Sequence, residues 1–65
     1  MKGTVKNWLD GRGFGFIDSE ELQEDVFVHY SELNGAYNLN RGQQVEFEVE
    51  DTHRGHRALD VQLVE

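Results

Sequence analysis

The amino-acid sequence predicts an all-β fold, a small closed β-barrel of five strands. Two observations support this prediction: polar and glycine-containing clusters divide the chain into five short β-like runs, and no stretch sustains the apolar period of a helix. With 65 residues, the chain can build one hydrophobic core, so we expect a single domain over 1–65. A sandwich of two sheets would need more strands, which favours the barrel.

The five expected strands follow one another with short connections. The turn DGRG at 10–13 is typical of a β-hairpin and joins the first two runs. The clearest strand is QVEFEVE at 44–50, where apolar residues alternate with glutamates, as in a strand with one buried and one wet side. The expected strands lie at 2–9, 13–18, 26–30, 43–50 and 58–64.

Alternation in the first three strands predicts two apolar faces. One face, expected to form the core, carries Val5, Leu9, Ile17, Val26 and Val28. The other face carries Trp8, Phe14, Phe16, Phe27 and His29. Aromatic residues in strands are more often buried on both sides, but this chain has no helix or spare strand to cover a second face. We therefore predict an exposed aromatic patch, which monomers rarely present without a ligand or partner.

Charge is unevenly distributed along the chain. Thirteen acidic residues against six lysines and arginines give a formal net charge of −7, which by itself argues against a nucleic-acid partner. The acids gather at 18–25, however, whereas 2–17 contains three basic residues and a single acid, and 53–57 holds two arginines and two histidines. Nucleic-acid binding stays open if the fold brings the two basic groups to one face. The alternative is an ordinary solvated surface of mixed charge.

The sequence contains no cysteine, which excludes disulfides, thiolate zinc sites and thiol nucleophiles and is compatible with a reducing cytosol. No apolar stretch approaches the roughly 20 residues of a membrane-spanning helix, and no signal peptide is recognisable. We therefore expect a cytoplasmic protein, most simply a monomer, without cofactor, metal or small-molecule substrate.

The expected aromatic patch suits nucleobases. Planar rings can stack on the faces of bases, while Lys6 beside Trp8 and Arg12 beside Phe14 can meet phosphates. Each stacked base contributes ~1–3 kcal/mol without any base-specific hydrogen bond. Duplex DNA hides its base faces, so the predicted partner is single-stranded RNA or DNA.

Five short motifs follow one another along nearly the whole chain: GTVK (3–6), RGFGFI (12–17), DVFVHYS (25–31), GQQVEF (42–47) and RGHRA (54–58). In order and spacing they resemble the cold-shock domain family, whose patterns are GTVKWFN, KGFGFI, DVFVHFS, EGQxVxF and KGPxA. RGFGFI and VFVHY correspond to the two ribonucleoprotein motifs of that family. The resemblance implies a five-stranded antiparallel OB-fold barrel that holds single strands on an aromatic face, with a frequent role as an RNA chaperone.

Carried over position by position, the resemblance implies a set of binding residues. They are Lys6, Trp8, Phe14, Phe16, Phe27, His29 and Tyr30, with Arg54 and Tyr37 from loops, and Arg12 joins them as the cation beside Phe14. The chain departs from the family at Asn7-Trp8, where Trp-Phe is usual, so one stacking platform is expected to be lost or displaced. His56 replaces the proline of KGP, and the segment between Ser31 and Gly42 is shorter than the common pattern.

Three other interpretations compete with strand binding. His29 and Ser31 share a strand face near Asp25, but no oxyanion donor or positioned third group can be argued, so an enzyme is not expected. His53 and His56 could ligate a metal, yet histidines without cysteine support in a short loop are more often solvated. The third alternative makes the aromatic patch a protein–protein interface, since tryptophan and tyrosine favour such surfaces.

Overall fold

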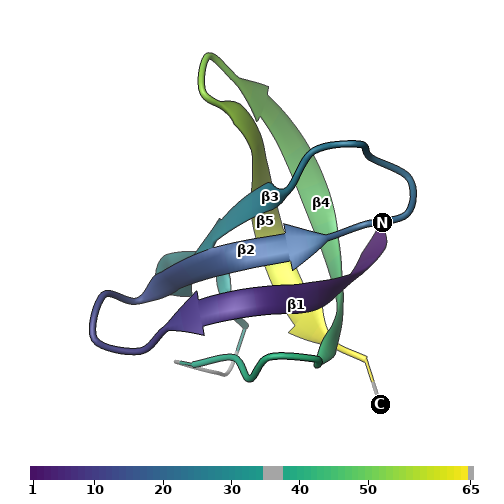
Figure 1. Ribbon diagram of the computed structural model, residues 1–65. Coiled ribbons are helices and arrows are strands. Elements are labelled where there is room, and N and C mark those ends of the chain that lie inside the picture. The colour runs from purple at the N-terminus through teal and green to yellow at the C-terminus, as the bar shows by residue number, and fades with distance from the viewer. Residues whose placement is uncertain (35–37, 65) are drawn as a thin grey trace.

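The computed structural model describes residues 1–34 and 38–64 and has the predicted all-β closed barrel (Figure 1). A short 3-10 helix, η1 (Tyr30–Glu32), follows the third strand. The strands are β1 (Lys2–Leu9), β2 (Phe14–Asp18), β3 (Val26–His29), β4 (Gln44–Thr52) and β5 (Gly55–Leu63). β4 ends later and β5 begins earlier than the predicted strands 43–50 and 58–64, because their pairing continues to Thr52 and Gly55 at the turn between them.

Around the barrel the strands follow the order β1-β2-β3-β5-β4, and β1 closes against β4. All pairings are antiparallel except that of β3 with β5, which run parallel at Val26↔His56 and Phe27↔Arg57. The parallel pair arises because β5, the second strand of the β4–β5 hairpin, returns beside β3 in the same direction (Figure 1). The fold class is confirmed, and the barrel is mixed rather than purely antiparallel.

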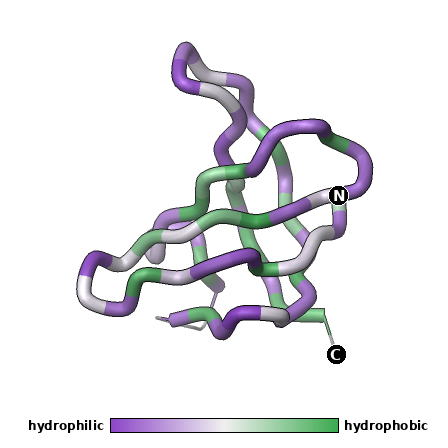
Figure 2. Tube along the Cα trace, viewed as in Figure 1, coloured by the Kyte–Doolittle hydropathy of each residue, from purple (hydrophilic) through white to green (hydrophobic). Residues whose placement is uncertain are grey.

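The core consists of apolar side chains, mostly aliphatic, from all five strands and from the segments between β3 and β4. Its buried members are Val5, Ile17, Val26, Val28, Leu33, Leu39, Val45, Phe47, Ala58 and Val61. Figure 2 shows hydrophobic residues spaced along the strands, whereas the connection between β2 and β3 is largely hydrophilic. No helix in the described part of the chain is long and apolar enough to cross a membrane.

A β-bulge in β1 corrects the predicted faces of this strand. The pairing passes from Val5↔Ile17 directly to Asn7↔Phe16 and Trp8↔Gly15, so the extra residue Lys6 reverses the alternation. Leu9, predicted in the core, is 41% exposed and pairs with Phe14 on the aromatic side. Trp8, predicted on the aromatic side, is half-buried and packs against the core.

Candidate nucleic-acid interface

The register of β1, β2 and β3 arranges the outward side chains in two rows. One row runs from Asn7 through Phe16 and Phe27 to Arg57. The other row runs from Leu9 through Phe14 to His29. Paired residues in a sheet point to the same side, so these side chains share one surface. We name the surface formed by Phe14, Phe16, Phe27 and His29 the aromatic face.

Phe27 is the centre of the aromatic face. Its ring centroid lies 5.7 Å from that of Phe14, with the planes tilted by 37°, and 6.0 Å from that of Phe16 in an edge-to-face contact. Such geometries are the favoured ones between aromatic rings. Mutual packing leaves all three rings half-exposed, so each keeps part of a ring surface open to solvent.

Tyr30 extends the aromatic face at the start of η1. It is 48% exposed, and its ring centroid lies 4.5 Å from that of His29. Its backbone N–H donates to Gly13 O at 2.9 Å, and the ring lies against Gly13, where an added Cβ would come within 2.7 Å of Tyr30 Cδ1. Gly13 has a φ of +72°, so the turn between β1 and β2 needs a glycine for both reasons.

His29 and Ser31 form a helix cap. Ser31 N–H donates to His29 Nδ1 at 3.2 Å, and Ser31 Oγ lies 2.9 Å from the same nitrogen. Because Nδ1 accepts the backbone bond, the proton of the neutral ring is assigned to Nε2. This arrangement explains the proximity of the two side chains by local structure, without a catalytic role.

The β4–β5 hairpin projects past β2 and β3 (Figure 1). Its side chains form one wall of a groove of about 570 Å³ beside the aromatic face. The groove is lined by Phe16, Phe27, His29, Thr52, Arg54, His56 and Arg57. The hairpin therefore brings the second basic group of the sequence to the aromatic rings.

Some basic side chains around the aromatic face lie beside carboxylates. Lys6 Nζ lies 3.0 Å from Asp25 Oδ2. Arg57 Nη2 and Nη1 lie 3.6 Å from Glu32 Oε2 and 3.8 Å from Glu50 Oε1. His56 Nδ1, in the groove, lies 2.7 Å from Asp51 Oδ1. Arg12 and Arg54 are exposed and make no ion pair within the described ranges.

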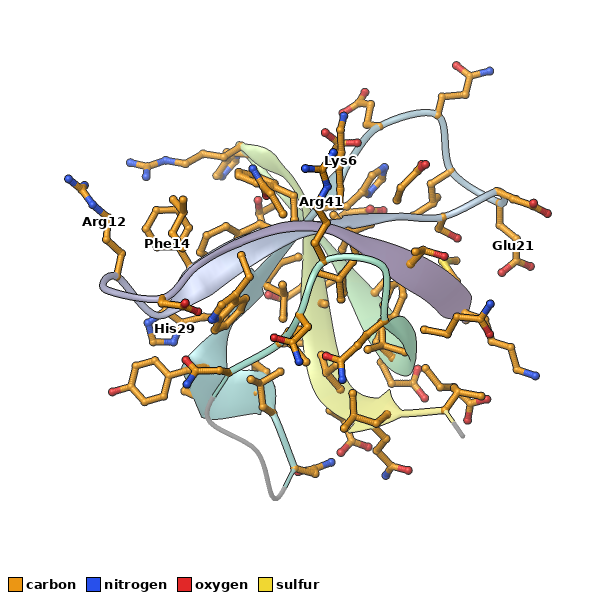
Figure 3. All side chains as sticks on the ribbon, turned by 60° about the horizontal axis from the view of Figure 1, so that its bottom comes forward. Lys6, Arg12, Phe14, Glu21, His29 and Arg41 are labelled. Carbon is orange, nitrogen blue, oxygen red and sulfur yellow. The ribbon has the colours of Figure 1, made fainter. Side chains whose placement is uncertain are left out.

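Sequence reasoning missed one cation, Arg41. Gly42 N–H donates to Val5 O at 2.9 Å, and Val5 N–H donates to Gln43 O at 2.8 Å, so the segment before β4 lies alongside β1. Figure 3 shows the exposed side chain of Arg41 beside Lys6. No local pattern could place Arg41 there, because the contact depends on barrel closure.

Two of the predicted binding residues, Trp8 and Tyr37, are not placed on the aromatic face. Trp8 Nε1–H donates to Asn38 Oδ1 at 3.2 Å, so its indole is directed toward the segment that precedes β4. Tyr37 lies outside the described residues. The remaining predicted residues, Lys6, Arg12, Phe14, Phe16, Phe27, His29, Tyr30 and Arg54, lie on the aromatic face or around it.

One group of acidic side chains lies away from the aromatic face. Figure 3 shows Arg12, Phe14 and His29 at one end of the barrel and Glu21 at the other. A second hollow, of about 580 Å³, has Asp18, Glu20, Glu21 and Glu46 in its lining. Acidic residues are therefore divided between this distant group and the carboxylates that pair with Lys6, His56 and Arg57 around the aromatic face. The described part of the chain contains no group of three or more His, Cys, Asp or Glu side chains that could hold a metal ion.

Comparison with known proteins matches this arrangement to one family. The model of the 'Cold-shock' DNA-binding domain matches residues 1–64. Cold shock-like protein CspC of Buchnera aphidicola is 44% identical over 63 residues, covering 94% of this chain and 91% of the relative. Cold shock-like protein CspC of Escherichia coli K12 is 42% identical over 66 residues, covering 98% of this chain and 96% of the relative. A cold shock-like protein of Aquifex aeolicus is 40% identical over 66 residues, covering 98% of this chain and 94% of the relative.

A solved structure shares the same architecture. The Drosophila Unr CSD456 structure superimposes with a TM-score of 0.81 at 25% sequence identity, covering 98% of this chain. The chain spans only 26% of that longer structure. Membership of a DNA-binding domain family agrees with the expectation that the protein is not an enzyme. By its fold, its aromatic face and a match over nearly its full length, the chain belongs to the cold-shock domain family.

Proposed function

We propose that this protein binds single-stranded RNA or DNA by stacking bases on the aromatic face, and acts as an RNA chaperone that keeps transcripts unfolded. The observation that carries the proposal is the packed trio of Phe14, Phe16 and Phe27 on the outer surface of the barrel. A surface of this kind suits the unstacked bases of a single strand, because bases in a duplex present only their edges.

The proposed interface combines stacking with few phosphate contacts. Contacts are expected from Lys6, Arg12, Phe14, Phe16, Phe27, His29, Tyr30 and Arg54, with Trp8 and Tyr37 at the neighbouring connection. Each stacked base contributes ~1–3 kcal/mol, so three or four stacks at the upper end of this range are compatible with micromolar affinity after ordering costs. Moderate affinity, without base-specific contacts at most positions of the bound strand, suits a chaperone, because a chaperone has to bind and release many different transcripts.

The binding proposal is tested by fluorescence anisotropy with labelled heptamers of RNA and DNA and with a duplex of the same length. Tighter binding of the single strands is expected. Equal affinity for the duplex would contradict stacking as the mechanism. An absence of binding to every nucleic acid would favour the alternative, a protein–protein interaction surface.

The chaperone role needs a separate measurement. A hairpin RNA carrying a fluorophore and a quencher should open at a lower temperature when the protein is present, because the protein binds only the open strand. Phe27→Ala should abolish most of this shift. We also propose that residues 1–65 act as one monomeric domain in the cytoplasm, without cofactor or small-molecule substrate.

A further inference from the structure

The bulge in β1 turns two consecutive side chains toward the aromatic face. In an unbroken strand Lys6 and Asn7 would point to opposite sides of the sheet. In the bulge Asn7 pairs with Phe16, Lys6 is the extra residue just before it, and both are exposed. A cation and an amide therefore stand next to each other beside the same ring.

Asn7 lies at the end of the row that continues through Phe16 and Phe27. Its amide makes no hydrogen bond within residues 1–34 and 38–64. Its side chain carries an acceptor oxygen and a donor nitrogen next to each other. The exposed amide is thus positioned to contact a ligand that lies on Phe16.

When a base stacks on a phenyl ring, the hydrogen-bonding groups on the edge of the base remain uncontacted, because the ring has no donor or acceptor. An asparagine amide beside that ring can bond the base edge through two parallel hydrogen bonds. Adenine fits this pairing on two edges, since its amino group lies between the ring nitrogens N1 and N7. The phosphate of the same nucleotide would meet Lys6, with Arg41 on the neighbouring segment.

We propose that the β1 bulge forms a nucleotide subsite in which Phe16 stacks the base, Asn7 reads its edge with a preference for adenine, and Lys6 holds the phosphate. This inference rests on the proposed function and refines it. The protein is then selective at one position of the bound strand and tolerant at the others.

The test separates hydrogen bonding from stacking by comparing adenine with unsubstituted purine, which has the same ring system but lacks the amino group. Each position of a labelled uridine heptamer is replaced in turn by one or the other, and the Kd is measured by anisotropy. At one position we expect wild-type protein to bind adenine about fivefold or more tightly than purine. Asn7→Ala and the near-isosteric Asn7→Leu should reduce this ratio to within about twofold.

Gln62→Ala is the matched control, because Gln62 is an exposed amide on β5 that pairs with Glu46 on the acidic side of the barrel. This variant should keep the adenine-to-purine ratio of the wild type. Binding without any adenine-to-purine difference, or a difference that persists in Asn7→Ala, would overturn the subsite and leave the proposed function standing. A failure of the wild type to bind any single strand would overturn both.

Discussion

Lys6 Nζ and Asp25 Oδ2 lie 3.0 Å apart, so the cation of the β1 bulge is held by a carboxylate in the unbound protein. Both side chains are substantially exposed, at 59% and 41%, and an exposed pair of this kind contributes little to stability. A phosphate that approaches Lys6 has to displace Asp25 and also meets its negative charge. We therefore expect the ion pair to lower the affinity for a nucleic-acid strand.

The first prediction follows from this competition. Asp25→Asn should tighten single-strand binding by about three- to tenfold at low salt, because Lys6 becomes available to phosphate and one repulsive charge is removed. Isothermal titration with a heptamer would measure the gain. Glu21→Gln is the control, since it removes the same charge at the far end of the barrel. Equal gains in both variants would show that net charge, and not the Lys6 pair, limits affinity.

The second prediction separates the aromatic face from the core. Phe27→Ala should weaken binding by ~1–3 kcal/mol, because it removes the central stacking ring. It should also lower the free energy of unfolding, by about 1 kcal/mol, since Phe27 packs against both Phe14 and Phe16. Ile17→Val, in the buried core, should lower the stability by ~0.5–1.5 kcal/mol and leave the affinity unchanged.

Thermal unfolding and anisotropy on the same samples check both variants. A large loss of affinity in Ile17→Val, with little change in Phe27→Ala, would mean that the two faces of the sheet have been assigned the wrong way round.

The third prediction concerns the turn that supports Tyr30. Gly13→Ala should destabilise the protein by about 1–2 kcal/mol, because a Cβ is strained at a φ of +72° and would lie 2.7 Å from the Tyr30 ring. Displacement of that ring should also weaken strand binding. Gly11→Ala is the matched control in the same turn, because a Cβ at Gly11 meets nothing within 4 Å. Similar losses in the two variants would contradict a specific Gly13–Tyr30 contact.

The sequence predicted the architecture well because alternation and turn residues are local signals. The core positions Val5, Ile17, Val26 and Val28 and the outward rings of β2 and β3 follow directly from a period of two. The bulge at Lys6 could not be predicted in this way, because one extra residue in a strand has no characteristic residue type that would reveal it in the sequence.

The errors at Trp8 and Leu9 both follow from that single bulge. The place of Arg41 beside β1 depended on a different kind of information, because barrel closure joins segments far apart in the sequence. The same holds for Arg57, which reaches the row of Phe27 only through the parallel pairing of β3 with β5.

The last prediction uses salt to separate stacking from phosphate contacts. For a single strand, log K falls against log salt with a slope of about −0.7 per neutralised phosphate. Lys6 and Arg57 exchange one anion for another on binding, whereas Arg12 and Arg54 have no carboxylate partner within the described residues. With about two to four phosphates neutralised, the slope should lie between about −1 and −3.

Variants then assign the two contributions to particular side chains. Arg54→Gln should reduce the magnitude of the slope by less than one unit, because it removes one phosphate contact. Phe27→Ala should lower K at every salt concentration and leave the slope unchanged, since stacking involves no counterion release. Affinity should therefore survive at salt concentrations that release a binder dominated by phosphate contacts. A slope steeper than about −5 would mean that such contacts dominate here too, and that the aromatic face is not the principal source of affinity.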